Sequence, residues 1–248
     1  MSASRSPWTP TTEFRVGTVL RRAWRIFTQH WLAFALLVLV GQIPQLVLTT
    51  LSITSRVPNT PGFWVGIMVG IIIVLLLSPI QNAVINLIAF NAMADRPTDV
   101  ATAFRRAVGW YLPMVGTFVL ISLAVSLGMI LLVIPGMIVA LMFCVASQAC
   151  IVERIGPITA LGRSRSLTKG YRWPILGLLL ICILLFIPFV AIQAVVALML
   201  PSTLAPLMSP LINALPTAFF AAIFPAVYHD LRVTKEGISS DRLVAVFD

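Results

Sequence analysis

The chain has 248 residues, of which 59% are hydrophobic and 10% are Asp, Glu, Lys or Arg. A soluble globular domain carries about 25% charged residues, so this composition excludes an ordinary water-soluble domain. The formal net charge is +9, yet the cations flank long apolar runs instead of forming a separate basic face. We therefore expect no nucleic-acid partner. We expect attraction to an anionic inner membrane leaflet, about 1 kcal/mol for each basic residue held near it.

Two segments contain no charged residue at all, 46 residues from 107 to 152 and 57 residues from 173 to 229. Shorter uncharged runs cover 26–55 and 57–94. About 20 apolar residues cross a bilayer core, so each long run must cross it, turn and return. The sequence predicts an all-α, polytopic membrane protein with six transmembrane helices, at about 31–53, 63–93, 110–134, 136–152, 174–200 and 211–229.

The first 12 residues contain no apolar segment followed by a cleavage site, so we expect a flexible tail and an uncleaved first span that acts as the insertion signal. The next segment carries an apolar stripe at helical spacing, with Val16, Leu20, Phe27 and Trp31 on it. Arginines fall elsewhere around this segment, which indicates an amphipathic helix at the membrane interface. We expect one membrane domain from 13 to 230 and a cytoplasmic C-terminal tail from 231 to 248.

This arrangement recurs three times. A basic segment precedes each odd-numbered span, and a Trp lies where that span begins. An Ile-Pro pair comes later in the chain than each of these Trp residues. Each even-numbered span ends at an acidic residue that is soon followed by Arg. The sequence therefore predicts three helical hairpins, each preceded by a basic interfacial helix. The recurring residues are Arg21, Arg22, Trp31, Ile43, Pro44 and Asp95, then Arg105, Arg106, Trp110, Ile134, Pro135 and Glu153, then Arg163, Trp173, Ile187, Pro188 and Asp230.

Between the third and fourth predicted spans the chain contains an Ile-Pro-Gly sequence at 134–136. Proline cannot continue the hydrogen-bond ladder of a helix, and glycine tolerates a chain reversal. We expect Pro135 and Gly136 to form the structural turn of the second hairpin.

The cations are distributed very unequally over this topology. Of the 17 Lys and Arg residues, 16 fall on the side that holds both termini, and only Arg56 falls on the other. All eight acidic residues also fall on the side of the termini. The positive-inside rule then places both termini in the cytoplasm, and we expect a multi-pass protein of the bacterial inner membrane.

The predicted spans carry none of the groups that membrane chemistry needs at depth. Their interiors contain no Asp, Glu, Lys, Arg or His; His30 and His229 lie at helix ends. The three cysteines, at 144, 150 and 182, show no CxxC spacing. A proton-coupled pump, a metal site or an intramembrane protease requires ionisable or metal-binding side chains inside the spans. We therefore expect no metal, no cofactor and no enzymatic activity.

Uncharged polar residues remain at membrane depth. Gln81, Asn82 and Asn86 cluster on the second predicted span, and the two asparagines share one face at a spacing of four residues. Such groups either hydrogen-bond between helices or line a polar cavity for a lipid headgroup or a solute. Single polar residues at similar depth are Gln42, Gln45, Ser122, Ser126, Gln148, Gln193 and Asn213.

The segment from 153 to 173 has the most recognisable pattern. After the Ile-Pro-Gly sequence and a helix that ends in Val-Glu, it contains Ala-Leu-Gly-Arg-Ser-Arg-Ser-Leu-Thr-Lys-Gly at 160–170 and then Trp173. This pattern resembles the membrane domain associated with some bacterial glycerophosphodiester phosphodiesterases and related six-helix bacterial membrane proteins. The resemblance covers most of 14–238. In the fused proteins a separate soluble barrel hydrolyses the substrate, so the resemblance implies a membrane module and supplies no catalytic residue.

The sequence thus favours a non-catalytic inner-membrane module that organises membrane lipid or a partner complex through a basic cytoplasmic face. A carrier or channel for lipid or a small solute, which would use the Gln81, Asn82 and Asn86 cluster, is the alternative, and a membrane enzyme is a third reading. The expected partners are membrane lipids and, in addition, a protein or a second copy of the chain. Candidate contacts to headgroups or a partner are Arg163, Arg165, Ser166, Lys169, Gly170, Arg105, Arg106, Arg21 and Arg22.

Overall fold

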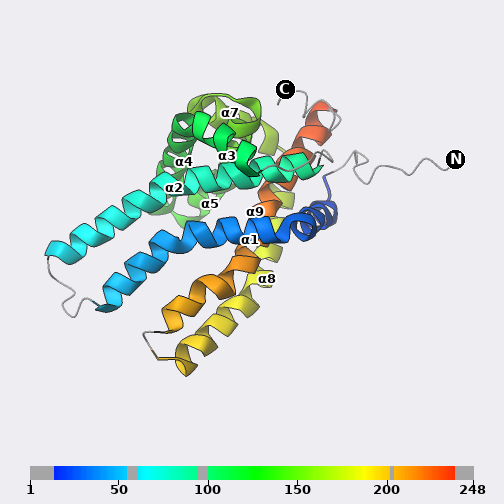
Figure 1. Cartoon of the computed structure of the whole chain (residues 1–248). Coiled ribbons are helices and arrows are strands. Elements are labelled where there is room, and N and C mark those ends of the chain that lie inside the picture. Colours follow the sequence, from blue (N-terminus) through cyan, green and yellow to red (C-terminus); the bar gives the residue numbers. More distant parts are fainter. Residues whose placement is uncertain (1–13, 55–60, 94–99, 202–203, 238–248) are drawn as a thin grey trace.

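The computed structural model describes residues 14–54, 61–93, 100–201 and 204–237, and in these ranges the chain forms helices without strands (Figure 1). Six stretches are long and apolar enough to cross a membrane. The all-α, polytopic membrane fold is therefore confirmed. The helices are α1 (Val16–Thr54), α2 (Pro61–Met93), α3 (Val100–Gly109), α4 (Tyr111–Leu131), α5 (Val133–Phe143), α6 (Ala146–Glu153), α7 (Pro157–Thr168), α8 (Arg172–Met199) and α9 (Ala205–Glu236).

Several boundaries differ from the expected ones. The fourth predicted span is two helices, α5 and α6, because the chain departs from helical geometry at Val145 (φ −112°, ψ 12°). The last helix continues to Glu236, and Leu231 is fully buried. Residues 231–236 therefore belong to the membrane domain and not to a tail. The predicted N-terminal tail and the chain after 237 lie outside the described residues.

Three hairpins, each with a short basic helix before it, are present as predicted. The short helices are the first part of α1, α3 and α7, and the hairpins are α1–α2, α4 with α5 and α6, and α8–α9. Between each short helix and its span one residue leaves the helical region in the same way. These residues are His30 (φ −130°, ψ 25°), Trp110 (φ −115°, ψ 21°) and Tyr171 (φ −115°, ψ 11°). The shared break turns the interfacial helix away from its span, as the first turns of α1 show (Figure 1).

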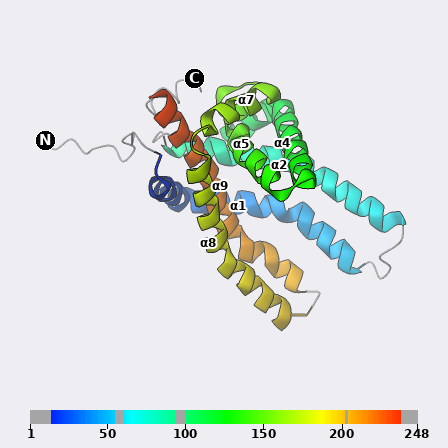
Figure 2. The same cartoon turned by 180° about the vertical axis from the view of Figure 1, so that it is seen from behind.

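The buried core lies at one end of the spans. Helix α2 is buried continuously from 83 to 90, whereas between 64 and 82 only Gly70 and Pro79 are buried among the residues with a described side chain. In α8 the last buried residue is Cys182. Away from the core, the α1–α2 and α8–α9 hairpins diverge (Figure 2). An apolar groove of about 580 Å³ opens between α8 and α9, lined by residues that include Phe186, Val190 and Phe220.

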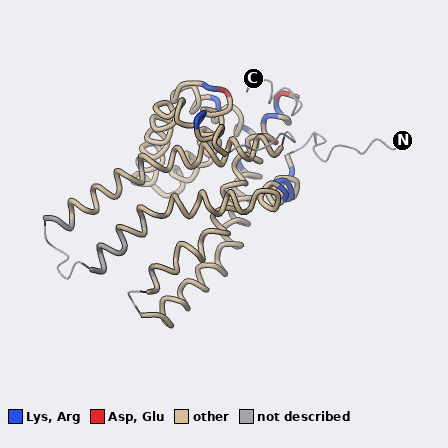
Figure 3. Tube along the Cα trace, in the orientation of Figure 1, with Lys and Arg blue, Asp and Glu red and all other residues tan. Residues whose placement is uncertain are grey.

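The same end carries the charges. Lys, Arg, Asp and Glu of the described chain gather around the start of α1, the end of α9 and the α3 and α7 region (Figure 3). We call this region the charged end. Apolar side chains gain little by leaving lipid for protein, whereas polar groups must find partners. The charged end is therefore where the three hairpins need to pack together.

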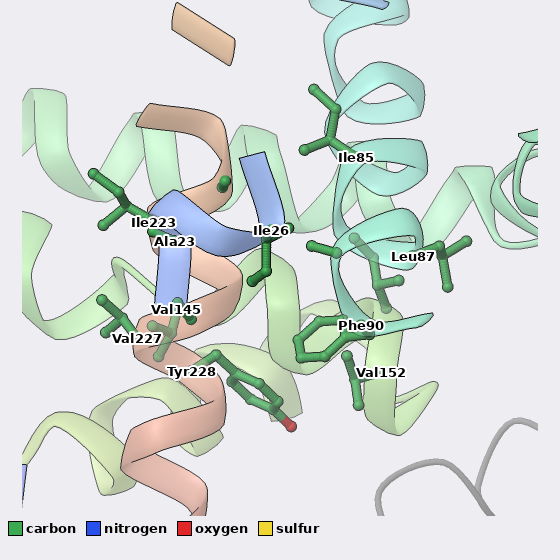
Figure 4. Packing of buried hydrophobic residues seen from close by; sticks show 14 of the residues in the cluster. Ala23, Ile26, Ile85, Leu87, Phe90, Val145, Val152, Ile223, Val227 and Tyr228 are labelled. Atoms are coloured by element: carbon green, nitrogen blue, oxygen red, sulfur yellow. The ribbon is translucent and has the colours of Figure 1, made fainter. Parts of the chain in front are cut away.

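Helices from all three units meet in this core (Figure 4). Tyr228 of α9 is fully buried, and its ring lies 5.7 Å from the ring of Phe90 of α2 in an edge-to-face arrangement. Ile26 of α1 and Val152 of α6 are fully buried beside them. Helix α1 packs along α9, so the first and last helices of the domain are neighbours.

The turn of the second hairpin differs from the prediction. The chain reverses at Leu132, which is extended (φ −168°, ψ 150°), and Pro135 and Gly136 lie inside α5. Pro135 falls in the first turn, where its missing N–H breaks no helical hydrogen bond. Gly136 instead permits close packing of α5 against α4. A Cβ atom added at Gly128 of α4 would lie only 2.8 Å from the Cα atom of Gly136. The prediction that Pro135 and Gly136 form the turn was therefore wrong. A glycine is needed at 136 because the backbones of α4 and α5 come close together there.

We predict that Gly128→Ala lowers the free energy of unfolding by ~1–3 kcal/mol, because the new methyl group meets backbone that cannot rotate away. Titration with SDS in mixed micelles measures this change. Gly177→Ala on α8 is the matched control, because no atom lies within 4 Å of a Cβ built there. Equal stabilities of the two variants would contradict the close-packing role.

Candidate functional site

The charged end contains two kinds of cation, those paired within the protein and those open to the surroundings. The first kind includes Arg22, which is 7% exposed and forms an ion pair with Asp230. Its Nη1 also lies 2.6 Å from Nδ1 of His229. Asp230 and His229 are both buried, so this cluster joins α1 to α9 inside the core.

His229 lies beside both members of this ion pair. Nδ1 of its imidazole is 2.6 Å from Nη1 of Arg22 and 3.3 Å from Oδ1 of Asp230. Nε2 is buried and has no partner among the described residues. Arg22 was predicted to contact a lipid headgroup or a partner, but it is buried and paired within the protein. Its buried carboxylate partner stands 208 positions later in the chain, which no local pattern reveals.

A second network joins α6, α7 and α9. Nε of Arg163 donates to both carboxylate oxygens of Glu153, at 2.8 and 2.9 Å, and Arg163 also pairs with Glu236. Tyr228 donates to Glu153 at 2.7 Å, and Arg232 donates to Glu236 at 3.0 Å. Burial tends to lower the pKa of Arg163, but its hydrogen bonds and ion pairs with the two glutamates outweigh this and raise the pKa. Arg163 is therefore a structural cation that fastens α7 to the hairpin ends.

Polar side chains of α7 also make contacts within the protein. Ser164 donates to the carbonyl of Met142 on α5 at 2.8 Å. The hydroxyl of Ser166 donates to the carbonyl of Arg163 at 2.7 Å, and the Ser166 carbonyl accepts from Lys235. Gly170 follows with φ +92°, a conformation that favours glycine. Ser166 and Gly170 were predicted contacts, and the structure gives both of them roles in shaping the end of α7.

The second kind of cation is exposed and forms no ion pair with a residue that the structure describes. Its members come from all three interfacial helices and the loops beside them. They include five predicted contacts and one that sequence reasoning did not single out, Arg154. They are Arg21, Arg105, Arg106, Arg154, Arg165 and Lys169. Lys235 is also exposed and outside the described ion pairs, but its Nζ donates to the Ser166 carbonyl.

The predicted intramembrane cluster is only partly brought together. Asn82 and Asn86 each donate to a carbonyl of their own helix four residues earlier, at 2.8 and 2.7 Å. A pocket of about 20 Å³ lies between Asn82, Thr117, Ser147 and other side chains of α2, α4 and α6. This volume suits about one water molecule and not a solute. Gln81 instead approaches α1, where the missing side chain of Gly41 leaves room for its carboxamide.

Among the described residues, no three His, Cys, Asp or Glu side chains are grouped so that they could hold a metal ion. Comparisons of the chain with protein-family models, with curated proteins and with solved structures find no match. The geometry of the charged end is therefore the basis for a functional proposal.

We predict that Asp230→Asn lowers the free energy of unfolding by ~3–5 kcal/mol, because it leaves the Arg22 guanidinium buried without a countercharge. The double variant Arg22→Met with Asp230→Asn should lose less than the single variant, because no buried charge remains. Arg21→Met is the control, an exposed neighbour that should change stability by less than ~0.5 kcal/mol. SDS titration of the four proteins decides this. A double variant less stable than Asp230→Asn would contradict the pairing.

Arg163→Gln should likewise lower the free energy of unfolding, by ~1–3 kcal/mol, because the charge-assisted hydrogen bonds to Glu153 are lost. Arg165→Gln, two residues away on the same helix and exposed, should have an effect below ~0.5 kcal/mol. The same unfolding experiment separates the two roles. Equal effects would mean that Arg163 contributes no more to the fold than a surface cation.

Proposed function

We propose that the chain is a non-catalytic module of the bacterial inner membrane that organises anionic lipid, or a partner complex, through the charged end. In this proposal both termini and the interfacial helices lie on the cytoplasmic side, where the leaflet is anionic. The exposed cations hold headgroups beside the protein, and the spans anchor these cations at the level of the membrane surface.

The observation that carries the proposal is the separation of the cations. Arg22, Arg163 and Arg232 are neutralised by carboxylates within the protein. The exposed cations, by contrast, surround the same end of an otherwise apolar body. Each contributes about 1 kcal/mol of attraction when held near an anionic surface. Such a set attracts acidic lipid without a catalytic group.

The sequence resemblance to the membrane domain of phosphodiesterase-associated proteins agrees with this proposal and stays a prediction. It implies a membrane module that acts beside a separate enzymatic domain. The part of the resemblance at 160–170 now has a physical account. Arg163 and Ser164 fasten the helix, whereas Arg165 and Lys169 face outward.

A carrier that uses Asn82 and Asn86 stays an untested alternative. The described residues offer a pocket of one-water size at that cluster, and the side-chain NH2 groups of both asparagines donate to carbonyls of their own helix. We therefore base the functional experiment on the charged end.

A variant with Arg21→Gln, Arg105→Gln, Arg165→Gln and Lys169→Gln should retain fewer phosphatidylglycerol molecules than the natural chain, because four exposed cations are removed. Native mass spectrometry of the protein released from nanodiscs of equal phosphatidylglycerol and phosphatidylcholine content counts the retained lipids. The preference of the natural chain for phosphatidylglycerol should also weaken with added salt, since exposed charges are screened.

The matched control keeps the charge at the same four positions, with Lys in place of each Arg and Arg in place of Lys169. We expect this control to retain the lipid preference. A natural chain without preference for phosphatidylglycerol would refute the proposed role in organising anionic lipid. A glutamine variant with an unchanged preference would refute it as well.

A further inference from the structure

A hollow of about 260 Å³ at the charged end has the features of an anion site. Two arginines line it, Arg106 of α3 and Arg154 after α6. Its apolar lining includes Leu87 of α2, Trp110 and Met114 of α4. Two basic side chains, one before the second hairpin and one after it, thus line one concave surface.

The two arginines at this hollow are not neutralised by any carboxylate of the described chain. Neither Arg106 nor Arg154 forms an ion pair with any residue that the structure describes. Glu153, next to Arg154 in the chain, is engaged instead by Arg163 and Tyr228. Two cations that share a concavity repel each other and raise the local attraction for an anion. Guanidinium groups bind the oxygens of a phosphate group in a bidentate manner. A phosphate group therefore suits this pair of arginines better than an uncharged, apolar ligand does.

The backbone at Arg154 provides an independent indication. Arg154 has φ +49°, and it is the only residue other than glycine with positive φ in the described chain. It follows the C-terminus of α6, at a position where glycine is the usual residue because a side chain strains this conformation. No carboxylate of a described residue pairs with the Arg154 side chain. A role of the Arg154 side chain in binding a ligand would account for this strained backbone.

The position of the hollow relative to the membrane indicates which kind of phosphate compound it binds. Trp110 lies at the break between α3 and α4, where the chain passes from the interfacial helix into a membrane span. Trp at such a boundary marks the headgroup level of a bilayer. A volume of 260 Å³ is below the about 300–1,000 Å³ of drug-sized ligand sites, so it holds a headgroup and not a whole lipid. The acyl chains stay in the surrounding bilayer.

We propose that this hollow is a specific site for the phosphate of an anionic phospholipid, with Arg106 and Arg154 as its two ligands and Trp110 beside the headgroup. This inference rests on the proposed function and goes beyond it. The basic face as a whole attracts anionic lipid, whereas one position on it selects and retains a single headgroup.

The test compares Arg106→Gln with Arg105→Gln, its neighbour on α3, which is exposed but does not line the hollow. Both variants lose one charge, so a general attraction predicts the same result for both. Native mass spectrometry in detergent, with phosphatidylglycerol added at increasing concentration, measures the dissociation constant of the tightest bound lipid. We expect a tenfold or larger weakening for Arg106→Gln and less than a twofold weakening for Arg105→Gln.

Arg154→Gly separates binding from folding. Glycine relieves the strained backbone and removes no ion pair of the described chain, so the variant should be at least as resistant to SDS as the natural protein. Its phosphatidylglycerol affinity should nevertheless fall tenfold or more. A variant that is less stable and also binds less would not meet this expectation. In that case the binding of Arg106→Gln in the still-folded protein would decide the proposal.

Two further probes identify the source of the phosphate. Inorganic phosphate and glycerol 3-phosphate, added at 1,000-fold excess over the lipid, should leave the tightest lipid bound if the site takes a membrane headgroup. Displacement of the lipid by either probe would overturn the lipid assignment in favour of a soluble phosphate compound. Equal weakening by Arg105→Gln and Arg106→Gln, with the preference for phosphatidylglycerol intact, would overturn the site alone. Absence of that preference in the natural chain would refute the proposed function as well.

Discussion

The contact between α1 and α9 at the charged end holds the domain together. Arg22 and Asp230 pair inside the core, and Nδ1 of His229 lies within hydrogen-bond distance of both. The hairpins diverge beyond this region, so the packing there and the apolar core around Tyr228 make one domain of three hairpins. In a membrane, burying one apolar surface against another gains little, and polar groups without partners are expensive. This difference between apolar and polar groups explains why the helices pack most closely at the charged end.

The need of buried charges for partners also divides the arginines into two groups. Those with a carboxylate in reach, such as Arg163 with Glu153, are part of the scaffold. Those without a carboxylate partner among the described residues, such as Arg106 and Arg154, are the ones that we propose bind a ligand with negative charge. The scaffold also positions the second set, because α7 is fastened by Arg163 and Ser164 and thereby carries Arg165 and Lys169 outward.

The threefold repeat gives the domain its geometry. Each unit passes from a basic helix into a span through one residue with nearly the same backbone angles, at His30, Trp110 or Tyr171. The units are not equivalent in the folded protein. The first and third supply the buried pair of Arg22 and Asp230, whereas the second carries both arginines of the proposed headgroup site. One repeated design thus provides a structural ion pair in one place and the proposed anion site in another.

The sequence by itself determined the class of protein, the six spans and the basic helix before each hairpin. These features depend on local properties: the length of uncharged runs, the spacing of apolar residues and the position of cations beside them. Only the tertiary structure decided which cations are neutralised, because Arg22 and Asp230, or Arg163 and Glu236, are far apart in the chain and meet through packing alone. It also decided that Gly136 serves contact between backbones instead of a turn, since close approach depends on the facing helix. The hollow between Arg106 and Arg154 arises in the same way, because a concave surface with two charges exists only after α3 and α6 have been placed around it.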